Sequence, residues 1–183
     1  MGKRFEEVTP ALRAWIEAQR VFFVATAPLS AEGHVNCSPK GLDTLCILGP
    51  REMAYLDLTG SGAETIAHLR ENGRIVIMFC AFEGPPRIVR LHGRGSVLLP
   101  GSTEWPRLRA QFPEQLGDRA IIRIELTRIS DSCGFGVPHY EFVEDRAALP
   151  QWCEKKGPDG LARYQRDKNA QSIDGLPGLQ EPG

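Results

Sequence analysis

The clearest candidate for chemistry in this sequence is a short turn, Thr59-Gly60-Ser61-Gly62. It follows an apolar run that contains Tyr55 and precedes a helix-forming stretch that begins near Glu64. Free backbone N–H groups and the positive end of the helix dipole meet at such a helix N-terminus, and the hydroxyls of Ser61 and Thr65 flank it here. The turn is therefore a candidate anion-binding site. The same residues also fit a plain strand-to-helix turn in which Ser61 and Glu64 form a capping box.

Several better-known motifs are absent. No lysine follows Gly62, so the turn is not a Walker A loop, and Thr65 stands where a dinucleotide-binding fingerprint needs its third glycine. GxSxG is absent, so no nucleophile elbow is indicated. The five cysteines form no CxxC pair and the four histidines form no HExxH motif. Nothing in their spacing predicts a disulfide framework or a metal site.

A few isolated side chains are further candidates. Lys40 follows Ser38-Pro39 at the end of a predicted strand and presents a cation there, although a lysine at this position is more commonly a solvated loop residue. Arg87 and Arg90 lie three apart on a predicted strand, so they point to opposite sides, and one of them faces a ligand or both make surface contacts. Cys133 lies in a glycine-punctuated loop, where a thiol is either reactive or buried and inert.

Composition narrows the class of protein. The 183 residues suffice for one domain with appendages, and 42% hydrophobic residues suffice for a sizeable core. A net charge of −1 argues against a nucleic-acid binder. No apolar run reaches transmembrane length, and the N-terminus lacks the apolar segment of a signal peptide. We therefore expect a cytoplasmic protein with reduced cysteines and no membrane partner.

The predicted elements indicate a mainly β fold, a β-barrel with peripheral helices. Apolar and alternating runs between turn residues predict six or seven strands, and strands and helices do not alternate as they do in a Rossmann fold. We expect an N-terminal helix within residues 1–20, a barrel over residues 21–130, and a loop, helices and tail over residues 131–183. The predicted strands are 21–26, 34–37, 44–48, 53–58, 74–82, 87–99 and 120–129, and the predicted helices are 9–20, 64–72, 103–112, 149–156 and 159–170.

The order of four motifs resembles a known family. These are Ser38-Pro39-Lys40-Gly41, the run from Tyr55 to Gly62, the buried run 74–79, and Pro86-Arg87-Ile88-Val89-Arg90-Leu91-His92-Gly93. Over residues 21–129 the chain is similar to the pyridoxamine 5′-phosphate oxidase-like, FMN-binding split-barrel proteins. The resemblance implies a six-stranded antiparallel split barrel, a homodimer, and FMN held in two symmetric clefts between the subunits.

The resemblance also implies which residues bind the cofactor. Two departures from the family pattern argue against a vitamin B6 enzyme: Glu64 and Thr65 replace an Arg-Lys pair, and Gly175 replaces an arginine that contacts the substrate. The expected function is thus an FMN-dependent oxidoreductase acting on an unknown small molecule. One alternative is a non-catalytic flavin-binding or redox-sensing protein. The other is a relative that uses deazaflavin or haem; for haem, the axial ligand would be His34, His92 or Cys133. The implied cofactor-binding residues are Asn36, Ser38, Lys40, Tyr55, Leu56, Thr59, Gly60, Ser61, Gly62, Thr65 and Arg87.

Overall fold

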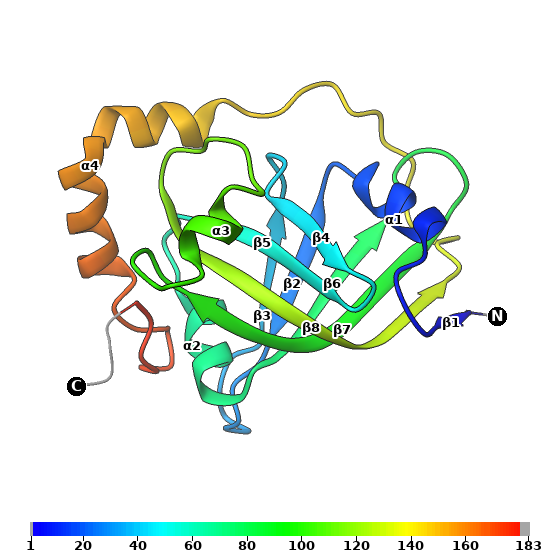
Figure 1. The fold of residues 1–183 in the computed structure, drawn as a ribbon, viewed down its shortest axis with the longest axis horizontal. Helices are drawn as coiled ribbons and strands as arrows, with labels where there is room; N and C mark the ends of the chain where they lie inside the picture. Colours follow the sequence, from blue (N-terminus) through cyan, green and yellow to red (C-terminus); the bar gives the residue numbers. More distant parts are fainter. Residues whose placement is uncertain (1, 180–183) are drawn as a thin grey trace.

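The structure is a computed structural model and describes residues 2–179. Within this range the chain forms eight strands, β1 (Arg4–Phe5), β2 (Phe22–Thr26), β3 (Asn36–Lys40), β4 (Leu45–Gly49), β5 (Glu52–Leu58), β6 (Arg74–Cys80), β7 (Ile88–Leu98) and β8 (Asp118–Ser132). They make one antiparallel sheet in the order β3-β2-β6-β7-β8-β5-β4, and β1 pairs with the end of β8 (Figure 1). The sheet curls around a common interior.

Four helices surround this sheet: α1 (Pro10–Glu17), α2 (Glu64–Asn72), α3 (Trp105–Arg109) and α4 (Ala148–Lys168). α1 begins where the Thr9 hydroxyl accepts a hydrogen bond from the Leu12 N–H, and α2 ends at Gly73, whose φ of 69° is left-handed. α4 bends at Gly157, as two predicted helical pieces anticipated. α4 and the tail lie at the same end of the molecule as α2, and α1 lies at the other end (Figure 1).

Two apolar clusters stabilise the fold. The larger one fills the interior of the curled sheet and includes Leu12, Ile16, Tyr55, Ile77 and Leu91. The smaller one lies on the other side of β5 and β8, beneath α3, and is formed by Ala54, Leu56, Leu108, Phe112 and Ile121. β5 and the start of β8 are therefore covered on both faces, which explains their nearly unbroken apolar sequences.

The predicted class, a mainly β fold with peripheral helices, is confirmed, but two details differ. The sheet has more strands than the six expected, and among the described residues β3 and β4, at its two ends, do not pair with each other. The predicted strand 34–37 has the wrong bounds, because β3 begins at Asn36 and continues through Ser38, Pro39 and Lys40. β3 pairs only with β2, so Pro39 sits in an edge strand, where its missing N–H costs little.

Candidate functional site

Three of the predicted β3 residues point to the same side of the strand. Asn36, Ser38 and Lys40 alternate along β3, so their side chains face the interior at the unpaired edge of the sheet. The Asn36 amide donates to the Thr65 hydroxyl at 3.0 Å, and the Ser38 hydroxyl donates to the Asn36 amide oxygen at 3.0 Å. The Lys40 ammonium donates to Asp57 at 3.1 Å. Polar side chains, rather than backbone hydrogen bonds, thus connect β3 to α2 and β5.

Asp57 is a fully buried carboxylate between two cations. Lys40 Nζ lies 3.1 Å from one oxygen, and Arg119 Nε lies 2.8 Å from the other. Burial alone would raise the pKa of Asp57, but the adjacent Lys40 and Arg119 outweigh burial and hold this pKa below its usual value. Arg119 also donates to the Gly60 carbonyl at 3.4 Å. Two cations against one carboxylate leave this cluster with a net positive charge beside the turn.

A second set of polar groups is buried next to this cluster. The Thr26 hydroxyl lies 2.9 Å from His68 Nδ1 and accepts from Asn36 at 3.4 Å. His68 Nε2 and the Tyr55 hydroxyl have no hydrogen-bond partner among the described residues, although Tyr55 lies near Thr65. Burial lowers the pKa of His68 and raises that of Tyr55, so both are neutral at pH 7. Unsatisfied buried groups of this kind often mark positions where a ligand or water binds.

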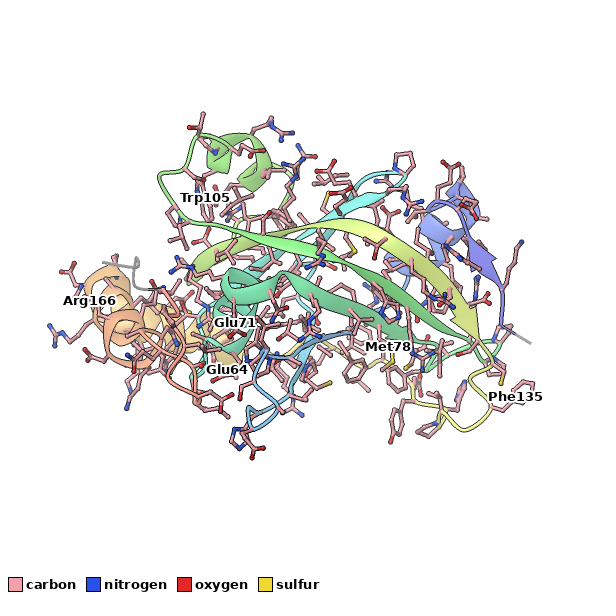
Figure 2. The ribbon with its side chains drawn as sticks, turned by 90° about the horizontal axis from the view of Figure 1, so that it is seen from below. Glu64, Glu71, Met78, Trp105, Phe135 and Arg166 are labelled. Atoms are coloured by element: carbon pink, nitrogen blue, oxygen red, sulfur yellow. The ribbon has the colours of Figure 1, made fainter. Side chains whose placement is uncertain are left out.

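The predicted anion-binding turn is covered by the chain's own C-terminal part. Gln165 donates to the Thr59 hydroxyl at 2.8 Å, and Asn169 donates to the Gly60 carbonyl at 2.9 Å. Thr59 in turn donates to the Gly117 carbonyl at 2.7 Å. Figure 2 shows α4, which carries Arg166, beside the start of α2 at Glu64. The C-terminal segment is therefore part of the wall of this site.

The predicted capping box is wrong. Ala63 is the N-cap residue of α2, and no side chain caps this helix. The Glu64 carboxylate lies over Gly62, where an added Cβ would overlap it, and it accepts a hydrogen bond from the Ile173 N–H at 3.3 Å. Glu64 thus connects the turn to the tail, and its negative charge lies at the helix N-terminus.

The structure places two of the other predicted residues elsewhere. Arg87 lies at the opposite end of β7 from α2, pairs with Asp131 at 2.9 Å, and covers the ring of Trp15. The arginine beside the turn is Arg119, which sequence reasoning missed because its partner Asp57 is 62 residues away. The Leu56 side chain faces the smaller apolar cluster, and its N–H donates to the Thr44 carbonyl at 2.8 Å.

The three alternative haem ligands lie on different parts of the chain. His34 pairs with Asp174 on the tail at 2.6 Å, His92 lies on β7, and Cys133 follows β8. Across residues 2–179 no group of three or more histidine, cysteine or acidic side chains is placed to hold a metal ion. In the same range, no helix is long and apolar enough to cross a membrane.

Comparison with known proteins identifies the family. Residues 8–133 match the family profile described as pyridoxamine 5′-phosphate oxidase. The pyridoxamine 5′-phosphate oxidase family protein ustO of Aspergillus flavus is 41% identical over 197 residues, and the match covers 96% of this chain and 77% of ustO. The chain therefore belongs to the pyridoxamine 5′-phosphate oxidase family, as the order of its motifs indicated.

Solved structures share the fold at lower sequence identity. A variant of HupZ from Group A Streptococcus superposes with a TM-score of 0.53 at 21% identity, covering 68% of this chain and 99% of that one. A candidate pyridoxamine 5′-phosphate oxidase from Lactobacillus delbrueckii gives a TM-score of 0.52 at 14% identity, covering 69% and 98%. These likenesses support the split-barrel architecture.

Proposed function

We propose that this protein is an FMN-dependent oxidoreductase that acts on a small molecule. The observation that carries the proposal is the net positive cluster of Lys40, Asp57 and Arg119, located beside the turn in a chain of this family. Around it lie the Asn36 amide and the hydroxyls of Ser38 and Thr65. Gly60 adds open space, since a Cβ there would meet nothing within 4 Å. This donor set fits an anionic, hydrogen-bonding cofactor.

The phosphate group of FMN has the strictest binding requirements of the cofactor's parts. A phosphate monoester carries a charge of about −1.5 to −2 at neutral pH, so it needs cations and N–H or O–H donors. Lys40, Arg119 and the exposed hydroxyl of Ser61 supply them. Glu64 opposes phosphate binding, because its carboxylate lies over Gly62. We infer that Glu64 turns away when the cofactor binds.

The chemistry of the bound flavin would be electron transfer to or from the substrate. The residues of this chain would bind, orient and enclose it. Lys40 would supply a positive charge. The Tyr55 hydroxyl and His68 Nε2, which have no hydrogen-bond partner within residues 2–179, would supply a donor and a neutral ring nitrogen. The C-terminal segment that contacts Thr59 would exclude water from this side.

A titration with two cofactors tests the phosphate contact. FMN and riboflavin differ only in the phosphate, so Lys40→Met should weaken FMN binding by about tenfold and riboflavin binding much less, if one charge-assisted contact of roughly 1.4 kcal/mol is lost. Lys155→Met, at an exposed position of α4, is the matched control. Equal losses for both ligands would refute the assigned role of Lys40.

Bound FMN that no small-molecule donor or acceptor reduces or reoxidises would instead favour a non-catalytic flavin protein.

We also propose that the protein is a homodimer. The outer face of β2 and β6 carries a half-buried apolar row that includes Met78 and the paired residues Ala25 and Val76. Figure 2 shows Met78 on the side of the sheet opposite Trp105 of α3. A second copy placed on this face would remove these side chains from water.

A single charge on this face tests the dimer. Met78→Glu places a carboxylate among the apolar residues of the proposed interface. In the folded monomer this carboxylate would pair with Arg90, the partner of position 78 on β7, so the monomer should stay folded. We expect light scattering to give a dimer mass for the wild type and a monomer mass for Met78→Glu, with an unchanged circular dichroism spectrum. A wild-type monomer at micromolar concentration would contradict this proposal.

A further inference from the structure

A cavity of about 780 Å³ lies outside the curled sheet, away from the turn. It is bounded by the end of α1, the start of β2, the β6–β7 loop and the segment 140–142. Its volume is in the range of small-molecule pockets. Phe23 lines the cavity, whereas its neighbour Phe22 points into the interior and is paired with Lys40. The cavity and the Lys40 cluster are thus on opposite faces of β2.

Aromatic side chains make up much of the wall of this cavity. The rings of Phe82 and Tyr140 stack, with centroids 5.5 Å apart and an interplanar angle of 26°. The Tyr140 N–H donates to the Phe82 carbonyl at 2.9 Å, and the Phe142 N–H donates to the Glu83 carboxylate at 2.7 Å. These bonds fix the segment 140–142 against the β6–β7 loop. The aromatic lining consists of Trp15, Phe23, Phe82, Tyr140 and Phe142.

Negatively charged side chains outnumber positively charged ones in the lining of the cavity. Glu83 and Glu141 carry negative charges, and Arg20 carries the one positive charge among the lining residues. The Arg20 guanidinium lies 5.0 Å from the centre of the Phe142 ring, so this ring already attracts a cation. Aromatic faces stabilise positive charge through their quadrupole, and two carboxylates add to this effect.

We propose that this cavity binds a small planar aromatic cation. The aromatic walls would stack on its ring system, and Glu83 and Glu141 would compensate its positive charge. This site does not depend on the proposed cofactor, because no residue of the Lys40 cluster lines it.

The experiment is a fluorescence titration of the full-length protein with berberine, a planar aromatic cation. We expect saturable binding of one berberine per chain, and binding at least fivefold weaker for 1-anilinonaphthalene-8-sulfonate, an aromatic anion. Ala18→Trp would fill the cavity from the end of α1, where Ala18 is exposed and has a helical φ of −77°. Ala14→Trp, one turn earlier and also exposed, does not line the cavity and is the matched control.

Ala18→Trp should weaken berberine binding at least tenfold, and Ala14→Trp should leave it unchanged within twofold. The double variant Glu83→Gln/Glu141→Gln keeps an acceptor for the Phe142 N–H but removes both negative charges, so berberine should bind about fivefold more weakly. Equal affinity for the two probes would overturn the assignment of a cation. Equal effects of Ala18→Trp and Ala14→Trp would overturn the location. Absence of berberine binding, with a dimer that Ala18→Trp dissociates, would assign the cavity to a second copy of the chain instead.

Discussion

Removing the buried charge of Asp57 should change two measured quantities in opposite directions: the stability of the fold should fall and the affinity for FMN should rise. Asp57→Asn leaves the Arg119 guanidinium, 5% exposed, without its counter-charge, whereas Lys40, 23% exposed, can reach water. Breaking a buried ion pair from one side costs about 3–5 kcal/mol, and asparagine retains one acceptor oxygen. We therefore expect the free energy of unfolding to fall by about 3 kcal/mol, which for a chain of this length lowers Tm by about 6–12 °C.

Cofactor affinity should change in the other direction. Without the Asp57 charge, the cluster carries two positive charges instead of a net charge of one, so FMN should bind more tightly while riboflavin does not. Asp118→Asn is the matched control, because Asp118 also contacts an arginine Nε, at 2.6 Å, but both side chains are partly exposed. That change should cost no more than about 1 kcal/mol.

The stability loss in Asp57→Asn should depend on pH. The folded-state pKa of Asp57 lies below its unfolded value, so its ionised form stabilises the fold at and above the unfolded pKa of about 3.9. This contribution disappears as the pH falls through the folded-state pKa. Denaturant unfolding monitored by circular dichroism should show a constant difference from pH 7 to pH 5 and convergence below about pH 4. A variant as stable as Asp118→Asn, or one that binds FMN more weakly, would refute this reasoning.

Two further predictions concern the same region. Glu64→Gln removes a carboxylate from beside the proposed phosphate position while keeping an acceptor for the Ile173 N–H, so an FMN titration should show about fivefold tighter binding and unchanged riboflavin binding; a weaker affinity for FMN would place the phosphate elsewhere. Burial lowers the pKa of His68 below its unfolded value of about 6.5, so protonation favours the unfolded state and stability falls as the pH drops below 6.5. His68→Gln should show a smaller loss between pH 7 and pH 5 in chemical denaturation, and an identical pH slope in both proteins would contradict this.

Local signals in the sequence were sufficient for much of the fold. The alternating sequence of residues 120–129 places Ile122, Ile124 and Leu126 on one face, and all three are buried in the interior. Thr9 before Pro10 marked the start of α1, and Gly73 marked the end of α2. Each of these signals depends on neighbours within a few residues, because side-chain periodicity and helix capping are local properties.

The candidate site depended on contacts that no local pattern encodes. The predicted strand 34–37 ended before Pro39, and only the position of β3 at the edge of the sheet makes this proline compatible with a strand. Arg119 reaches Asp57 across the pairing of β8 with β5. The contacts from Gln165 and Asn169 to the turn join segments more than 100 residues apart, so the cover of this turn could not be read from the motif.

The central claim is that the protein binds FMN, and the most direct test is the absorption spectrum of the purified protein followed by mass spectrometry of what denaturation releases. Our account predicts a yellow protein with flavin absorption that releases FMN, or a colourless protein that takes up added FMN to one equivalent per chain. A protein that neither contains nor takes up FMN would contradict the account, and uptake of deazaflavin or haem in its place would redirect it to those cofactors.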